Sequence, residues 1–151
     1  MLFEKALIAH CSPTLASLKI ANLFSYPFET DAELEGHVSY WNSQMEKAGI
    51  CLTVLRKRNQ RALIYVCRSS EMEKELKNVQ VAKFLSAYGY KQMELADALE
   101  HLKERLSEDS EFPHEMGIFL GYPLADVVGF IYHNGKNFQI SGPWKVYGDR
   151  E

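Results

Sequence analysis

Cysteine is scarce in this sequence, and so are the patterns that make cysteine informative. Only three occur, Cys11, Cys51 and Cys67, and no CxxC spacing is present. An odd number of widely separated cysteines argues against a disulfide scaffold and against a zinc site. The count fits a reducing compartment, so we expect a cytoplasmic protein whose thiols, if they have a role, act singly.

Long apolar runs and an excess of charge of one sign are also missing. Nowhere do about 18 uncharged apolar residues follow one another, and Glu4 and Lys5 interrupt the N-terminal stretch MLFEKALIAHC. We therefore expect neither a membrane span nor a secretory signal. The net charge is −3 with both signs interspersed, which argues against nucleic acid as a partner. No βαβ order or glycine-rich phosphate loop indicates a nucleotide-binding fold.

The elements that can be read from the sequence predict a single α+β domain over residues 1–151, mostly helical, with a small antiparallel sheet. Two β-rich runs around RKRNQR predict a hairpin over residues 50–67, and NFQISGPWKVYG near the C-terminus is the candidate third strand. Helical spacing and capping residues predict the longer helices, over 31–47, from Ser69 onward, and over 79–88 and 93–106.

Proline marks the irregular points of the chain. Residues 2–9 predict one or two helical turns, after which Ser12 reads as an N-cap with Pro13 at the first helical position of a helix over 14–19. Tyr26-Pro27 predicts a loop. The segment FPHEMGIFLGYPLADVVGFI contains two further X-Pro steps, which predict two short helices separated by Gly121 in the left-handed conformation that ends a helix.

Several motifs together resemble a known family. HCSPTLASLK, LIYVCR, FPHEMGIFLGYPLADVVGFI and GPWKVYGD, in this order, are similar to a small bacterial family catalogued as a domain of unknown function, number thirty-seven ninety-three. The resemblance covers nearly the whole chain and implies a single cytoplasmic domain. Family members look like proteins of anaerobes, in some cases encoded near flavodoxin-like or iron-related genes, which implies redox or metal metabolism. The resemblance supplies no catalytic residues.

One chemical hypothesis joins Cys11 and His114 in a thiol-dependent enzyme. Cys11 precedes the predicted cap before Pro13, where helix-terminal amides would lower the thiol pKa. His114 falls in the first turn of the next proline-initiated helix, where the same positive end favours a neutral imidazole. Glu115 cannot orient that ring, because successive helical residues point about 100° apart. A third member would have to come from Asp126 or Asp31.

A second hypothesis is a cofactor pocket. Gly117, Gly121 and Gly129 allow close backbone approach, and neighbouring aromatic residues could form walls for flavin or haem, although close helix packing uses the same residues. The predicted binding residues are His10, His114, Gly117, Gly121, Tyr122 and Trp144. Metal ligation by His10, Cys11 and His114 is an alternative without a recognisable ligand motif.

The hairpin carries the one dense basic patch. RKRNQR, with Arg68 further along, could keep a strand connection soluble or anchor a phosphate or an acidic redox protein such as a flavodoxin-like partner. If the turn is short, Cys51 and Cys67 lie near each other, either as two reduced core thiols or as a pair that oxidation can bridge. We therefore expect a ligand-binding or redox-accessory protein. The alternatives are the thiol-dependent enzyme and an interaction module working through the basic hairpin.

Overall fold

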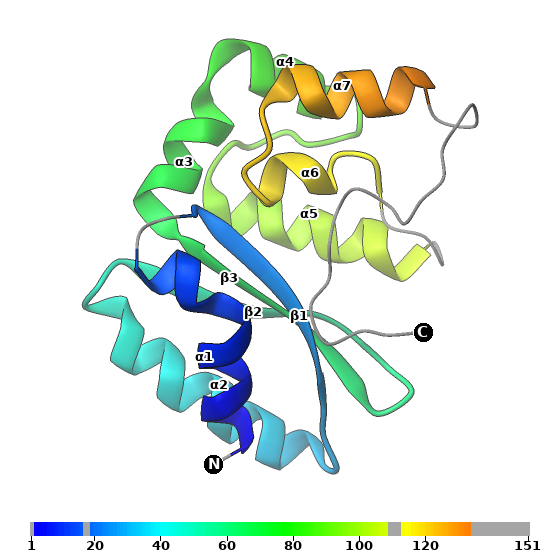
Figure 1. The fold of residues 1–151 in the computed structure, drawn as a ribbon. Helices are drawn as coiled ribbons and strands as arrows, with labels where there is room; N and C mark the ends of the chain where they lie inside the picture. The colour runs from blue at the N-terminus through cyan, green and yellow to red at the C-terminus, as the bar shows by residue number, and fades with distance from the viewer. Residues whose placement is uncertain (1, 17–18, 109–112, 134–151) are drawn as a thin grey trace. The chain divides into compact units, whose positions relative to one another are not determined.

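A computed structural model describes residues 2–16, 19–108 and 113–133 (Figure 1). The chain divides into two compact units, one ending at Met72 and the other beginning at Glu73. The predicted α+β class is confirmed, since the chain is mostly helical and has a small antiparallel sheet. A single domain over residues 1–151 stays a prediction.

The first unit is built on a sheet of three antiparallel strands, β1 (Ala21–Pro27), β2 (Ile50–Arg58) and β3 (Arg61–Arg68), in the order β1-β3-β2. The predicted hairpin is confirmed. Its turn has two residues, Asn59 and Gln60, both with positive φ, of 55° and 61°. Positive φ at both central positions is the geometry of a type I′ turn, which matches the twist of the strands and sets their register.

The loop predicted at Tyr26-Pro27 is wrong. These two residues form the end of strand β1. Proline is tolerated there because β1 is an edge strand. Every second backbone N–H of an edge strand points away from the sheet, so its loss breaks no hydrogen bond of the ladder. The candidate C-terminal strand over 137–148 lies outside the described residues.

Two helices, α1 (Leu2–Leu15) and α2 (Asp31–Glu46), pack on one face of this sheet (Figure 1). Side chains alternate across a strand, so the even-numbered residues of β3 and of the start of β2 face these helices. The predicted helix over 31–47 is confirmed, with Thr30 as its N-cap. The buried core between helices and sheet includes Phe3, Leu7, Cys11, Phe24, Leu34, Leu52, Ile64 and Val66.

Helix α1 corrects the prediction that Ser12 caps a new helix. The helix continues past Pro13, and the Ser12 hydroxyl donates a hydrogen bond back to the carbonyl of Ile8. Phe3, Leu7 and Cys11 lie on one face at intervals of four residues and are all buried. Burial of this face stabilises the continuous helix, and tertiary packing of this kind outweighs a local capping signal.

The second unit is helical. After α3 (Ser69–Lys77), in which the division between the units falls, come α4 (Val79–Ser86), α5 (Leu95–Glu108), α6 (Met116–Phe119) and α7 (Leu124–His133). The predicted apolar face of α5 is confirmed, since its five periodic residues are buried: Leu95, Ala98, Leu99, Leu102 and Leu106. None of the helices within the described ranges combines the length and the hydropathy that a bilayer span requires.

Gly121 and the step at Pro123 behave as predicted, whereas α6 begins only at Met116, three residues after Pro113. Short helices α6 and α7 follow Pro113 and Pro123, and Gly121 separates them with a φ of 90°. The Gly121 N–H donates to the Ile118 carbonyl and the Tyr122 N–H to the Gly117 carbonyl, each at 3.0 Å. This is a Schellman motif, which satisfies carbonyls that the end of a helix would leave without partners.

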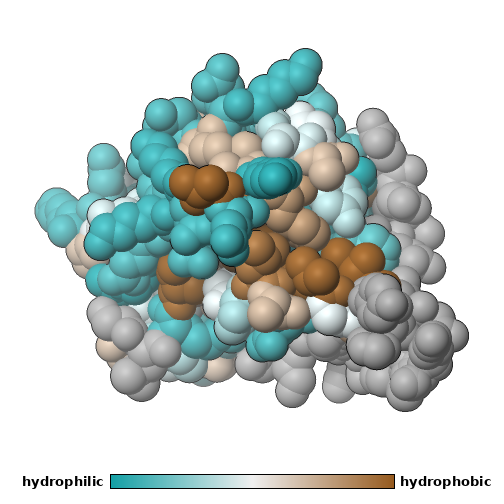
Figure 2. Space-filling model, turned by 90° about the horizontal axis from the view of Figure 1, so that it is seen from above, coloured by the Kyte–Doolittle hydropathy of each residue, from teal (hydrophilic) through white to brown (hydrophobic). Residues whose placement is uncertain are grey.

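Part of the surface is apolar. Figure 2, a view onto the face that lies at the top of Figure 1, shows brown side chains among hydrophilic ones. Val79 at the start of α4 and Val128 within α7 are among the large apolar residues exposed to solvent. Singly exposed apolar residues are common on protein surfaces, so these two by themselves indicate no function.

Candidate functional site

Cys11 lies inside a helix and not in front of one. It occupies the C-terminal half of α1, and a helix C-terminus presents carbonyl groups, which do not stabilise a thiolate. Its side chain is fully buried in the core of the first unit. Burial raises the pKa of the Cys11 thiol to about 12, although Lys19 acts in the opposite direction. The predicted activation of Cys11 by a helix N-terminus is therefore wrong.

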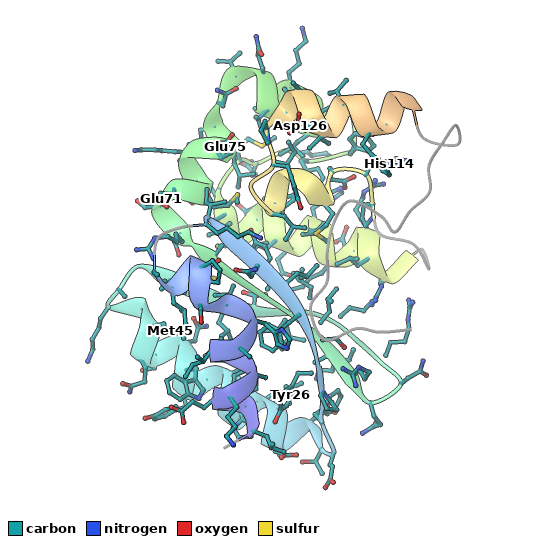
Figure 3. The ribbon with its side chains drawn as sticks, in the orientation of Figure 1. Tyr26, Met45, Glu71, Glu75, His114 and Asp126 are labelled. Carbon is teal, nitrogen blue, oxygen red and sulfur yellow. The ribbon has the colours of Figure 1, made fainter. Side chains whose placement is uncertain are left out.

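His114 lies in the turn that precedes α6, so its predicted place in the first helical turn is also wrong. His114 belongs to the second unit, whereas Cys11 and Asp31 belong to the first. Asp31 forms an ion pair with Lys57, with Nζ and Oδ1 3.0 Å apart. Figure 3 shows Asp126 on α7, apart from His114. The predicted dyad is thus divided between the two units, and the thiol-dependent enzyme stays a prediction.

The predicted cofactor residues are divided in the same way. His10 lies in α1, where its ring stacks on Phe24 with centroids 5.4 Å apart and burial lowers its pKa. Gly117 is buried in α6 of the second unit, and Gly121 and Tyr122 form the cap of that helix. The flavin or haem pocket stays a prediction, and its predicted residue Trp144 lies outside the described ranges.

The described part of the chain contains no cluster of side chains suited to metal ligation. Over residues 2–16, 19–108 and 113–133, no group of three or more His, Cys, Asp and Glu side chains could hold a metal ion. His10 and Cys11 are successive residues of one helix, so their side chains point in different directions.

A buried carboxylate in the second unit was not anticipated as a structural centre. The Glu115 side chain is fully buried and accepts a bidentate pair of hydrogen bonds from Arg105, with Nε to Oε2 at 2.6 Å and Nη2 to Oε1 at 2.8 Å. The Tyr90 hydroxyl donates to Oε2 at 2.9 Å. The hydrogen bond to Glu115 raises the pKa of the Arg105 guanidinium. Paired charges of this kind hold the turn before α6 against α5.

The groups around this ion pair are also held in place. The Arg105 guanidinium lies 5.1 Å from the ring centroid of Tyr88, a cation–π contact. His101 Nε2 lies 3.0 Å from the Tyr88 carbonyl oxygen, and its ring meets Tyr90 edge-on. Burial raises the pKa of the Tyr90 hydroxyl, and the carboxylate beside it acts in the same direction. Glu115 and Tyr90 are buried and hydrogen-bonded, and Arg105 is partly exposed, which suits a structural ion pair better than a site that exchanges protons.

Sequence reasoning dismissed Glu115 as a partner of His114 and did not consider Tyr90 or Arg105. Ten residues separate Arg105 from Glu115, and 25 separate Tyr90 from it. These separations follow no helical or strand period, so no sequence pattern could have indicated the cluster.

The first unit contains a second pair of reactive side chains, Cys51 on β2 and Cys67 on β3. They are direct register partners across the two antiparallel strands. The backbone N–H of the next residue, Leu52, points away from β3 and donates to Asn42 Oδ1 at 3.2 Å. Since N–H groups alternate in direction along a strand, the N–H of Cys51 points toward β3. Cys51 and Cys67 therefore form a hydrogen-bonded pair, with Cα atoms about 5.5 Å apart.

The two thiols differ in environment. Cys67 is fully buried, and a hydrogen bond to Cys51 followed by burial raises the pKa of its thiol strongly. The Tyr65 hydroxyl, also fully buried, is hydrogen-bonded to Cys67. Cys51 is half-buried, and its Sγ lies 3.6 Å from the Thr53 hydroxyl. The side chains of Thr53, Cys51, Cys67 and Tyr65, in this order, thus form a short chain of polar contacts across the two strands.

An open groove lies beside the start of β2. It has a volume of about 610 Å³ and runs between α2 and the start of β2. Its lining is mostly small and polar: Ser39, Asn42, Ser43, Glu46, Gly49, Ile50, Cys51 and Ser69. Cys51 belongs to this lining and is half-buried, whereas Cys67 is fully buried.

Comparisons with known proteins give a family and no activity. No curated protein and no solved structure matches the chain. Residues 7–151 match the model of a family described as protein of unknown function, DUF3793. Because this match spans nearly the whole sequence, the resemblance noted from the motifs is confirmed, and the chain belongs to the DUF3793 family.

Proposed function

We propose that this protein is a redox-accessory protein whose working group is the pair of thiols on Cys51 and Cys67. The observation that carries the proposal is their position as opposite residues on adjacent strands, with Cys51 half-buried and Cys67 fully buried. A disulfide needs Cα atoms about 4.4–6.8 Å apart, and a hydrogen-bonded pair of an antiparallel ladder falls inside this window.

The same geometry makes the proposed disulfide easy to reduce. In a hydrogen-bonded pair the Cβ atoms are near the wide end of about 4.5–5.5 Å, whereas a relaxed disulfide has them about 3.8 Å apart. Closing the bond therefore strains the two strands. Strained disulfides have higher reduction potentials and are found among labile or regulatory bonds. Reversible chemistry of this kind suits the reducing cytoplasm that the scarcity of cysteine predicts.

The proposed reaction is an exchange with a disulfide carried by a small molecule or by a partner protein. The Cys51 thiol loses its proton to solvent, its thiolate attacks one partner sulfur, the partner S–S bond breaks, and the first partner thiolate leaves and takes up a proton from solvent. The Cys67 sulfur then attacks Cys51 Sγ, giving up its proton to the leaving partner thiolate. Two protein thiols are oxidised to one disulfide, and the partner disulfide is reduced to two thiols. An acidic redox protein, as predicted from the sequence, is one source of that disulfide.

The test is oxidation of the full chain by glutathione disulfide, followed by alkylation of remaining thiols and intact-mass analysis. We expect the wild type to lose two alkylatable thiols without retaining glutathione. Cys67→Ala should instead accumulate a glutathione adduct on Cys51, because the second step is blocked. Cys51→Ala should remain unmodified, since the two remaining thiols, of Cys11 and Cys67, are fully buried.

Cys11→Ala is the matched control, because it also removes one buried thiol of the first unit but should oxidise like the wild type. The proposal is wrong if wild-type protein keeps three alkylatable thiols throughout, or if the bond that forms includes Cys11. Circular dichroism of each variant shows whether the fold is retained.

A further inference from the structure

Two hydroxyl-bearing side chains accompany the thiol pair on the sheet of the first unit. On β2, Thr53 follows Cys51 by two residues. On β3, Tyr65 precedes Cys67 by the same interval. The two cysteines are register partners, and so are Thr53 and Tyr65. Since successive side chains of a strand point to opposite faces, all four share the face of the sheet that is turned away from α1 and α2. Each thiol therefore has a hydroxyl group as its neighbour on its own strand.

The two hydroxyl groups differ in their surroundings. Thr53 is half-buried, and its Oγ1 lies 3.6 Å from Cys51 Sγ. Tyr65 is fully buried, and its hydroxyl is hydrogen-bonded to Cys67. Burial raises the pKa of the Tyr65 phenol well above its ordinary value, so this group keeps its proton at any pH at which the thiols react. The Tyr65 hydroxyl is therefore the donor in this hydrogen bond, and the Cys67 sulfur accepts it.

This hydrogen bond acts on a thiol that is otherwise difficult to ionise. A hydrogen bond to Cys51 and burial both raise the pKa of the Cys67 thiol, whereas the hydrogen bond from Tyr65 lowers it. A donor that faces a sulfur atom favours the thiolate, because a hydrogen bond to an ionised group is stronger than one to a neutral group. The Tyr65 hydroxyl thus stabilises Cys67 most at the moment when Cys67 loses its proton.

We propose that Tyr65 is a catalytic residue of the thiol–disulfide exchange, and that its hydroxyl donates a hydrogen bond to the Cys67 sulfur while that sulfur attacks Cys51. The inference rests on the redox function proposed above. In this step the S–S bond between Cys51 and the partner breaks, and the bond between Cys51 and Cys67 forms. The Cys67 proton passes to the partner thiolate that leaves, and Tyr65 keeps its own proton throughout.

The size of the effect follows from the chemistry of thiols. At a pH below the pKa of a thiol, lowering that pKa by one makes attack about threefold faster, because the tenfold gain in thiolate outweighs the loss in nucleophilicity. A hydrogen bond to an ionised group typically lowers a pKa by about one or more. In the reverse reaction the same hydrogen bond stabilises Cys67 as the leaving thiolate. Loss of the Tyr65 hydroxyl should therefore slow ring closure at least about threefold.

The test is rapid mixing of the full chain with glutathione disulfide at neutral pH, followed by acid quenching at timed intervals and intact-mass analysis. The masses separate formation of the glutathione adduct on Cys51 from its conversion into the protein disulfide. Tyr65→Phe retains the buried ring and removes the hydroxyl alone. We expect the adduct to form at the wild-type rate and then to close at least about threefold more slowly, so that it accumulates. A loosened sheet would change the first step as well.

Two control variants separate this role from a general effect on the sheet. Tyr26→Phe makes the same substitution in β1, on the face that packs against α1 and α2, and should leave both steps unchanged. Thr53→Val removes the other hydroxyl of the group with almost no change of shape, and should affect the first step at most, since Thr53 contacts Cys51. Thermal melts of the three variants establish that each retains its fold.

The possible failures can be told apart. Equal rates of ring closure in the wild type and in Tyr65→Phe would overturn this inference and leave the redox proposal standing. Equal slowing in Tyr65→Phe and in either control variant would also overturn it, because the effect would then not belong to the hydroxyl beside Cys67. Absence of a bond between Cys51 and Cys67 in the wild type would overturn both proposals.

Discussion

The thiol pair of the first unit and the buried carboxylate of the second are both polar clusters in protected surroundings, yet they differ in what surrounds them. Glu115 is enclosed and meets Arg105 and Tyr90 with short, well-directed hydrogen bonds. Cys51 is half-buried, belongs to the lining of an open groove and lies opposite a second cysteine on the neighbouring strand. A fully satisfied buried network stabilises one structure, whereas an accessible pair with two chemical states can respond to a partner.

The largest expected effect concerns the buried carboxylate. Glu115→Ala should lower the free energy of unfolding by about 3–5 kcal/mol, because it leaves the Arg105 charge without its buried partner. Denaturant titration of the full chain measures this loss. Glu100→Ala, which removes an exposed carboxylate paired with Lys103, should cost less than about 1 kcal/mol. Similar losses in the two variants would mean that the cluster is not a structural centre.

The helix end that follows this cluster should show the next largest effect. Gly121→Val should destabilise the protein by about 1 kcal/mol or more, since a β-branched residue is strained at a φ of 90°. Gly129→Ala, in the helical interior of α7 with no atom near the added Cβ, should instead stabilise by about 0.5–1 kcal/mol. An unchanged melting temperature in Gly121→Val would contradict the Schellman assignment.

The thiol of Cys11 should make stability depend on alkaline pH. Burial raises its pKa from the ordinary value of 9.0 to about 12, so the folded state holds the proton more tightly than the unfolded state. The resulting contribution to stability is complete below pH 9 and is lost as the pH rises toward 12. The difference in free energy of unfolding between wild type and Cys11→Ala should therefore shrink over this range. A constant difference would mean that the buried thiol does not titrate as expected.

The last prediction concerns the reactivity of the cysteines and involves no change in stability. Iodoacetamide at neutral pH should label half-buried Cys51 before Cys11 and Cys67, both of which are fully buried. Peptide mapping after brief exposure measures the order, and labelling in denaturant should remove the differences. Faster labelling of Cys11 would restore the thiol-enzyme hypothesis that its burial argues against.

Much of the secondary structure follows from local patterns. The helical spacing of α5, the helix over 31–47 and the glycine after α6 all appear as predicted, because each depends on residues within one or two turns. Strand β1 was missed because Ala21–Tyr26 are buried on both faces, so the segment lacks the alternation that identifies a strand. The Ser12-Pro13 signal failed because burial of the α1 face against the sheet outweighs a local cap.

The candidate sites also differ in whether local sequence or tertiary contacts determine them. Composition and local chemistry in the chain were enough to indicate an α+β protein, the basic hairpin and the neighbourhood of Cys51 and Cys67, since a short turn brings adjacent strands together. Only the folded chain decided that Cys11 is a buried core residue, that Glu115 joins Arg105 and Tyr90, and that a bulge places Arg56 and Arg58 on the same face of the hairpin as Arg61. These outcomes depend on burial and on contacts between residues distant in sequence, and neither has a period that a sequence can display.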